Sequence, residues 1–518
     1  MTPARHALRI ALLTAFAAAL LGRLAATTEV MYADGLRYVA AAQAVVRGDW
    51  TASVVRSVDH PAYPIAVAAA HRLLGLDDGP QGWQTAAQAV SVLAGAALVA
   101  PLYLVALELF GPTSAWLACL LTFLVPTTGH VMADVLSESL FLLFWTWGCW
   151  SALRFFREGA TSWLAPTIAC AAAAYLTRPE GLLLPAALAA TLALTPLAAR
   201  LRLPRPAWIR ASALVIVGPV LLVGPYVAIK GGVGTKPAVA RLLGTAPKSS
   251  ATAVERERPL DPDQTALKAF AVAWRGMFRA VQAAVTTPLL ALAAFGLIFR
   301  GPARDPGQAR GRLFVAMYSG LWMLALVRLY ATGGYCTPRH ALILAFPLIA
   351  AAAHGLVRLA GRIADRLPTT ATDARRLAPR LTYAACLALV AGVWGPQTLA
   401  PINADYNGYR AAGDWLAAHA PPDAKVFDLK GWALYYGRRP GYSFADFPAA
   451  DGDPNLRYLV AHDAFLIGEW PYCQAVRDHV AGRPPIASFP PTRRKGVAQV
   501  HVFELTPALA RSEPAATH

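Results

Sequence analysis

Several segments of the sequence place ionisable side chains beside long apolar runs, and their types suit acid–base and phosphate chemistry. The first, MYADGLRYVAAAQAVVRGDW at residues 31–50, carries Asp34 and Arg37 just after an apolar run. An aspartate can take the proton of a reacting hydroxyl, and an arginine can bind phosphate through two N–H groups at once. Four further segments, SVDHPAYP, HVMADVLSESLF, LTRPEGLLLP and YCTPRHALILAFP, add these candidates: Asp59, His60, Asp134, Glu138, Arg178, Glu180, Arg339 and His340.

Each candidate also has a purely structural interpretation. Asp34 suits the start of a helix, because aspartate is a favoured N-cap. Arg178 can extend towards lipid headgroups, and Asp134 with Glu138 has the i, i+4 spacing of neighbours on one helix face. We interpret Asp59 as a solvated loop acid. The shared position of these residues at the ends of apolar runs favours chemistry, since ionisable groups there are costly and face a cavity or a partner.

The composition indicates a protein that crosses the membrane several times. Of 518 residues, 56% are hydrophobic and 15% are charged, and the mean hydropathy is +0.42, which is more apolar than a soluble domain requires. Much of the net charge of +17 lies in short loops, so we attribute it to membrane topology and expect no nucleic acid partner. Four of the six cysteines lie in apolar runs, and the spacing of the other two, Cys336 and Cys473, does not support a disulfide.

Eleven apolar runs are long enough to predict transmembrane helices. They lie near residues 8–28, 85–109, 114–131, 135–153, 162–177, 181–199, 211–229, 284–299, 313–330, 341–357 and 381–399. Eighteen arginines and four acids fall in the loops 1–9, 110–113, 154–161, 200–210, 300–312 and 358–380. The positive-inside rule places these loops and the N-terminus in the cytoplasm. The loops 29–84 and 230–283, and the chain after about residue 400, then lie outside.

The chain divides into a membrane part, residues 1–400, and a small soluble α/β domain outside, residues 401–518. In the second part YRAAGDWLAAHA has the pattern of a helix, while PPDAKVFDL, LRYLVAHD and VAQVHVFEL have the pattern of strands between turns. Within the membrane part, residues 264–283 predict an amphipathic helix with Leu267, Phe270 and Trp274 on one face. Such a helix rests in the membrane interface.

The segments with ionisable residues resemble those of a known family. DGLRY and HPAYP are similar to the first external loop of the GT-C superfamily membrane glycosyltransferases, nearest to the protein O-mannosyltransferase and aminoarabinose transferase-like group (glycosyltransferase family 39-like). Gly35 stands where that group usually has a glutamate, and Ala62 replaces a proline. The residues that carry the resemblance are Asp34, Arg37, Tyr38, His60, Pro61 and Tyr63, and in later segments Asp134, Glu138, Arg178, Glu180 and Arg339.

The resemblance implies a GT-C fold in the cell membrane with its active site on the external face. It implies transfer of a sugar from a polyprenyl-phosphate-linked donor, among membrane lipids, to a hydroxyl of a protein, lipid or polysaccharide acceptor. Asp34 would be the general base, and Asp134 and Glu138 further catalytic residues that bind the sugar or assist the base. The resemblance assigns the donor phosphate and sugar to Arg37, His60, Tyr63, Arg178, Glu180 and Arg339.

Other interpretations remain open at this stage. No His/Cys cluster indicates a metal, so no cofactor is expected, and a divalent cation shared by Asp34 and Asp134 is the alternative. A transporter or flippase of lipid-linked precursors is a second possible function, although it would favour charges at mid-membrane and two similar halves. A non-catalytic membrane scaffold whose outer domain binds a partner is the third.

Overall fold

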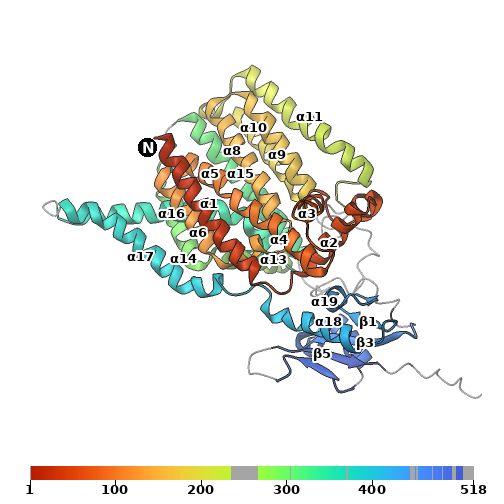
Figure 1. The fold of residues 1–518 in the computed structure, drawn as a ribbon. Coiled ribbons are helices and arrows are strands. Elements are labelled where there is room, and N and C mark those ends of the chain that lie inside the picture. Colours follow the sequence, from red (N-terminus) through yellow and green to blue (C-terminus); the bar gives the residue numbers. More distant parts are fainter. Residues whose placement is uncertain are drawn as a thin grey trace, which may run out of the picture.

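The structure of the chain is a computed structural model. It describes residues 2–234, 266–303, 305–368, 372–443, 450, 453–468, 471–480, 482–492 and 498–505. Figure 1 shows a bundle of helices, from α1 to α17, with a small sheet domain attached at one end. We call the end of the bundle that meets the sheet domain the site end.

The bundle is built from long apolar helices and from helices broken by bends. Several begin at a proline, as α4, α6 and α7 do. The N–H groups in the first turn of a helix have no partner within the helix, so a proline, which has no N–H, loses no hydrogen bond there. The helices of the bundle are α1 (Pro3–Ala26), α4 (Pro80–Ala97), α5 (Val99–Phe110), α6 (Pro112–Leu124), α7 (Pro126–Ala133), α8 (Glu138–Glu158), α9 (Leu164–Thr177), α10 (Leu183–Leu194), α11 (Arg205–Lys230), α13 (Ala266–Val285), α14 (Thr287–Ile298), α15 (Pro306–Gly333), α16 (Leu342–Asp365) and α17 (Thr372–Thr398).

In the described part of the chain, seven helices are long and apolar enough to cross a membrane, or nine if two bent pairs each count as one span. The bent pairs are α6–α7, with an angle of 70°, and α13–α14, with an angle of 96°. The sequence predicted eleven spans, and the two that fall short are α8 and α9. α9 has only 14 residues, and α8 carries Glu138, Arg157 and Glu158 at its ends. Contacts with neighbouring helices compensate for the short length of α9 and the charges of α8, since α8 packs against α4, α5, α9 and α15.

Close packing within the bundle depends on small residues. α14 crosses α16 at Gly296, where an added Cβ would lie 2.1 Å from the carbonyl oxygen of Ala351 and 2.7 Å from the nitrogen of Gly355. α16 also buries four consecutive alanines at 350–353. Small residues let membrane helices approach closely, so that van der Waals contact holds them together. This packing explains the alanine richness of the sequence.

The polypeptide between α1 and α4 lies at the site end and contains α2 (Ala33–Val46), a π-helical segment (Thr51–Arg56) and α3 (Ala62–Leu73). Two short 3-10 turns interrupt the bundle: η3 (Pro179–Leu182) follows α9, and η7 (Pro338–Ala341) precedes α16. Proline opens each turn, and it cannot continue the hydrogen bonds of a preceding helix. Arg178 and Arg339 therefore lie at breaks between helices.

The C-terminal domain contains a five-stranded sheet, and the strand and helix patterns of the sequence are confirmed. The strand order is β2-β1-β3-β5-β4; β1 is parallel to β2 and β3, while β5 is antiparallel to β3 and β4. The elements are α18 (Asn407–His419), β1 (Lys425–Asp428), α19 (Trp432–Gly437), β2 (Gly441–Tyr442), β3 (Leu456–His462), α21 (Asp463–Ile467), α22 (Pro471–Val480), β4 (Ala487–Phe489) and β5 (Val500–Glu504).

The C-terminal domain shares a hydrophobic core with the site end of the bundle. Buried side chains of α2, α3 and α4, among them Tyr38, Val67 and Trp83, belong to the same cluster as Tyr409 and Phe427 of the sheet domain. Burial of apolar surface contributes about 25 cal/mol per Å². Apolar contacts therefore hold the domain against the bundle, in addition to the covalent connection through the chain.

The predicted amphipathic helix is α13. Its buried side consists of residues such as Ala273 and Met277, while Phe270 and Trp274 are exposed, in agreement with a helix that rests on lipid. Residues 235–265 of the predicted outer loop lie outside the described residues. All six cysteines are free.

Replacing Gly296 by alanine is expected to destabilise the bundle, although alanine favours a helix over glycine by about 1 kcal/mol. The added methyl group would meet the carbonyl of Ala351, and overpacking costs about 1–3 kcal/mol. Gly320 of α15 is the matched control, because its Cβ would have nothing within 4 Å and Gly320→Ala should keep or raise stability. Thermal unfolding in detergent compares the two variants, and equal shifts would contradict this packing.

Candidate functional site

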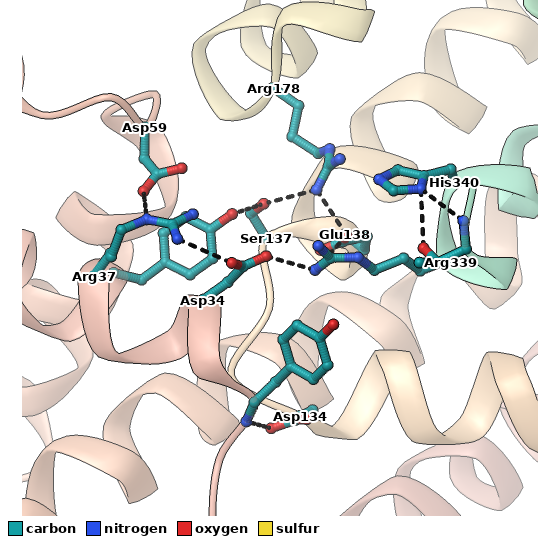
Figure 2. Close-up of polar contacts among 12 residues, drawn as sticks. Asp34, Arg37, Asp59, Asp134, Ser137, Glu138, Arg178, Arg339 and His340 are labelled. Atoms are coloured by element: carbon teal, nitrogen blue, oxygen red, sulfur yellow. Dashed lines mark hydrogen bonds and ion pairs between the residues drawn. The ribbon is translucent and has the colours of Figure 1, made fainter. Parts of the chain in front are cut away.

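Asp34 lies in the first turn of α2 and contacts two arginines. One carboxylate oxygen is 3.0 Å from Arg37 Nη1, and the other is 2.7 Å from Arg339 Nη1 (Figure 2). The residue that caps α2 is Tyr32, so the interpretation of Asp34 as an N-cap is wrong. A negative charge in the first turn of a helix also interacts favourably with the partial positive charge of the helix N-terminus.

Glu138 is the second acidic centre and lies at the start of α8. Its Oε1 is 2.7 Å from Arg178 Nη1 and 3.7 Å from Arg339 Nη1. Arg178 Nη2 also contacts Glu180 Oε1 at 2.8 Å. Glu138 is 3% exposed, and a carboxylate at such depth needs these partners, since an unpaired buried charge costs several kcal/mol. Arg339 thus joins Glu138 to Asp34.

Arg37 extends these contacts to an acid that the sequence analysis placed in solvent. Its Nε donates to Asp59 Oδ2 at 3.0 Å, and Asp59 is 1% exposed. The interpretation of Asp59 as a solvated acid is wrong, because the loop folds back onto α2. Burial lowers the pKa of Arg37, but the carboxylates of Asp34 and Asp59 outweigh it and hold the pKa above its usual value. In the sequence, the adjacent His60 in SVDHPAYP was the feature that could have indicated the burial of Asp59.

Seven charged side chains consequently alternate in sign along one line of contacts, which we call the ion-pair chain. It connects α2, the loop before α3, α8, η3 and η7 (Figure 2). In order, its members are Asp59, Arg37, Asp34, Arg339, Glu138, Arg178 and Glu180.

A small pocket lies along one half of the ion-pair chain. Its polar lining is Glu138, Arg178, Glu180, Trp322, Arg339 and His340. The Nε of Arg339 is buried and has no hydrogen-bond partner among the described residues. Buried N–H groups are nearly always paired, so an N–H without a partner at this depth is unusual. The guanidinium also lies 4.8 Å from the ring centre of Tyr32, within the range of a cation–π interaction.

Tyr38 and Ser137, which the sequence analysis did not single out as site residues, support the ion-pair chain. The Tyr38 hydroxyl lies 2.9 Å from Ser137 Oγ, and Arg178 Nη1 donates to the same oxygen at 3.4 Å. Tyr63, predicted to bind the donor, packs edge-on against Tyr38 with 5.1 Å between ring centres. Its hydroxyl donates to the Ala87 carbonyl at 3.1 Å. The structure thus places Tyr63 behind Tyr38 and outside the pocket lining.

His60 does not contribute to the ion-pair chain or to the pocket lining. Its ring centre lies 4.9 Å from that of Tyr175 and 5.5 Å from that of Tyr226, and the residue is 2% exposed. The structure places His60 in an aromatic cluster beside the site.

Asp134 also lies apart from the arginines, as Figure 2 shows. It is the C-cap of α7, whereas Glu138 begins α8, so the two do not share a helix face and the i, i+4 interpretation is wrong. Asp134 Oδ1 accepts from the backbone N–H groups of Tyr32 (3.1 Å) and Val135 (2.7 Å), and Oδ2 accepts from Asn403 Nδ2 (2.9 Å). These contacts anchor the start of α2 to the C-terminal domain.

Metal binding was left open between Asp34 and Asp134. In the described structure the Asp34 carboxylate contacts arginines, and the Asp134 carboxylate accepts from N–H groups. Among the described residues, no group of three or more His, Cys, Asp or Glu side chains could hold a metal ion.

Comparisons with known proteins address the fold and the family. Residues 78–223 match the sequence profile of the family described as dolichyl-phosphate-mannose-protein mannosyltransferase. That segment contains Asp134, Glu138, Arg178 and Glu180. No functionally curated protein matches the sequence significantly.

Solved structures share the architecture of the chain. ArnT from Cupriavidus metallidurans, solved bound to undecaprenyl phosphate, has 14% identity and a TM-score of 0.56, with 97% of this chain and 98% of that chain covered. The archaeal oligosaccharyltransferase AglB from Archaeoglobus fulgidus, solved with an inhibitory peptide and a dolichol-phosphate, has 10% identity and a TM-score of 0.58, with 91% and 72% covered.

The fold is therefore that of the GT-C enzymes: a multi-pass helical bundle with a small sheet-containing region at the C-terminus. Residues 78–223 in sequence, and the described chain in fold, thus resemble the GT-C superfamily of membrane glycosyltransferases.

Asp134 leads to a prediction about pH. Burial raises its pKa from 3.8 to about 6, against the opposing effect of Asn403 and the backbone N–H donors. The folded protein then binds this proton more tightly than the unfolded chain, so the stabilisation is fully present below about pH 4 and is lost as the pH rises through 6. The pKa difference corresponds to about 3 kcal/mol.

The stability of wild type relative to Asp134→Asn is expected to fall by up to this amount between pH 4 and pH 7. Denaturant unfolding of both proteins across this range measures the difference. A difference that does not change with pH would contradict the assignment.

Proposed function

We propose that this protein transfers a sugar from a polyprenyl-phosphate-linked donor to an acceptor hydroxyl, at the outer face of the cell membrane. The observation that carries the proposal is Arg339, whose buried Nε–H lacks a partner among the described residues while its Nη1 contacts Asp34 and Glu138. A phosphate acceptor for that N–H would lie next to Asp34, the proposed base.

Two of the similar structures support a lipid phosphate as the donor carrier. ArnT was solved with undecaprenyl phosphate and AglB with a dolichol-phosphate. Both ligands are phosphate monoesters of long prenyl chains, the species that remains when a sugar leaves its carrier. A pocket among apolar helices, lined by two arginines, has the chemistry to hold such a head group.

The proposed reaction is a single displacement at the anomeric carbon. The acceptor oxygen forms a bond to that carbon while the bond from the carbon to the phosphate oxygen breaks, and its electron pair stays on the phosphate. The hydroxyl proton passes to the Asp34 carboxylate. Because the leaving phosphate gains one negative charge, cations placed beside it lower the barrier.

Each arginine has a distinct part in this scheme. Arg339 and Arg178 hold the phosphate, since both line the pocket and a guanidinium can contact a carboxylate and a phosphate through different N–H groups. Arg37 orients Asp34 from the other side. Glu138, and Glu180 with it, keep the two phosphate-binding arginines in place and contact the sugar.

The distribution of arginine between the loops supports an active site at the outer face. α2, which carries Asp34 in its first turn, lies at the site end, and α1 starts at the opposite end of the bundle. With the arginine-rich loops in the cytoplasm, the site end and the C-terminal domain face outward.

Purified protein in detergent should release polyprenyl phosphate from at least one member of a panel of polyprenyl-phosphate sugars. Asp34→Asn is expected to lower the turnover rate about 10²- to 10⁴-fold, the usual contribution of a general base, while donor binding persists. The matched control is Glu108→Gln, because Glu108 also contacts two arginines, Arg154 and Arg157, but outside the pocket at Arg339; it should keep normal turnover.

Normal turnover in Asp34→Asn would remove Asp34 as the base. Release from no donor would favour the other functions considered, a transporter or flippase of lipid-linked precursors or a non-catalytic scaffold. Transport of a labelled lipid-linked sugar across proteoliposomes separates those two.

The proposed reaction uses arginines where many transferases use a divalent cation. Treatment with EDTA followed by transfer into metal-free buffer should leave turnover within about twofold of the untreated enzyme, since the leaving phosphate is compensated by guanidinium groups. Loss of turnover that Mg²⁺ or Mn²⁺ restores would contradict this part of the proposal.

A further inference from the structure

Residues 27–32 connect α1 to α2, and we call the last three of them, Val30, Met31 and Tyr32, the strap. The strap belongs to no helix or strand, and Val30 and Met31 have no exposed surface. Buried backbone N–H and C=O groups need hydrogen-bond partners. Four of these groups, the Val30 carbonyl, the N–H and carbonyl of Met31, and the Tyr32 N–H, bond to side chains. The Tyr32 carbonyl accepts from the backbone N–H of Gly35.

Met31 is held from both sides by α19. Its N–H donates to the hydroxyl of Tyr436 at 3.0 Å, and its carbonyl accepts from Trp432 Nε1 at 2.8 Å. The Tyr436 hydroxyl donates onward to Gln84 Oε1 of α4 at 2.7 Å, so it acts as acceptor and donor at once. Gln84 Nε2 in turn donates to the Thr28 carbonyl at 3.0 Å.

The two ends of the strap are held by Asn403 and Asp134. Asn403 Nδ2 donates to the Val30 carbonyl at 3.0 Å and to Asp134 Oδ2 at 2.9 Å. Asp134 Oδ1 accepts from the N–H of Tyr32 at 3.1 Å. The partners of the strap are therefore Trp432, Tyr436 and Asn403, which follow the last bundle helix, and Asp134, which Asn403 binds.

The helix that supplies Trp432 and Tyr436 is itself fixed in the C-terminal domain. Asp428, at the end of β1, accepts from the backbone N–H groups of Lys430 (3.0 Å) and Ala433 (2.6 Å). The ring of Tyr409 packs on Trp432 with 5.0 Å between ring centres. α19 is thus connected to the sheet.

The position of Asp34 depends on the strap. Tyr32 is both the last strap residue and the N-cap of α2, and Asp34 lies in the first turn. The α2 backbone begins where the strap ends, so a displacement of the strap moves the Asp34 carboxylate relative to Arg339, which it contacts at 2.7 Å.

We propose that the C-terminal domain is a positioning element of the site: through the strap, Trp432, Tyr436 and Asn403 hold Asp34 in register with Arg339. They act on the strap and not on the substrate, so they are positioning residues. The kinetic part of the test, which measures kcat and KM, rests on the proposed sugar transfer. The hydrogen–deuterium exchange part does not.

Tyr435 supplies a matched control for Tyr436. Its hydroxyl donates to the carbonyl of Pro80 in α4 at 3.0 Å, so it crosses the same interface from the neighbouring position of α19. It does not bond to the strap in the described structure. Tyr435→Phe and Tyr436→Phe each remove one hydroxyl from the docked domain, and only the second releases the Met31 N–H.

The experiment compares both variants with wild type in full-length protein. Tyr436→Phe should lower kcat about tenfold to a hundredfold, because a small displacement of a reacting group costs this much, with KM for the donor within about twofold. Tyr435→Phe should keep both constants. Hydrogen–deuterium exchange should accelerate in the peptide containing Met31 for Tyr436→Phe and not for Tyr435→Phe.

Each outcome bears on the proposal. Equal kcat in the two variants overturns it, and so does unchanged exchange at Met31. If wild type turns over no donor, the proposed function fails, whereas the exchange data still decide whether the domain holds the strap. Should Tyr436→Phe not fold, Asn403→Gly serves instead. Asn403 has φ 57°, which glycine adopts without strain. This change removes the side chain that bonds to Val30 and Asp134 without straining the backbone, and it should lower kcat in the same way.

Discussion

Oppositely charged side chains must meet wherever a membrane protein removes them from water, because an unpaired charge in a low-dielectric surrounding costs several kcal/mol. In this chain the requirement is met by a line of contacts in which each arginine lies between two carboxylates. The pairing draws together α2, the loop before α3, α8, η3 and η7, which are distant in sequence. The prolines that open η3 and η7 interrupt the helical bundle at these points, and Arg178 and Arg339 lie at the two breaks.

The ion-pair chain begins and ends with a carboxylate, so its four acids exceed its three arginines by one. A donor phosphate would therefore compete with carboxylates for guanidinium N–H groups. Arginine suits this competition, because its five N–H groups have fixed directions and can serve two anions at once. The Nε–H of Arg339, without a partner in the described structure, is such a group beside Asp34.

Two aspartates near the site show how surroundings decide the role of one residue type. Asp34 is held by the guanidinium groups of Arg37 and Arg339. Asp134 is surrounded by backbone and amide N–H groups, and it joins the bundle to the C-terminal domain. The hydrophobic core shared by bundle and domain keeps water from these bonds. The domain is thus part of the structure that supports the site.

The sequence by itself determined the fold class and most of the ion-pair chain. Apolar runs of membrane length and the strand patterns after residue 400 follow from local composition, and Asp34, Arg37, Glu138, Arg178, Glu180 and Arg339 were visible as charges at the ends of those runs. Only the tertiary structure decided that Asp59 is buried against Arg37, that Asp134 faces Asn403, and that Tyr63 and His60 lie behind the site. A helix break between Asp134 and Glu138 and the docking of the C-terminal domain onto the strap depend on contacts between distant segments, and local spacing carries no record of those contacts.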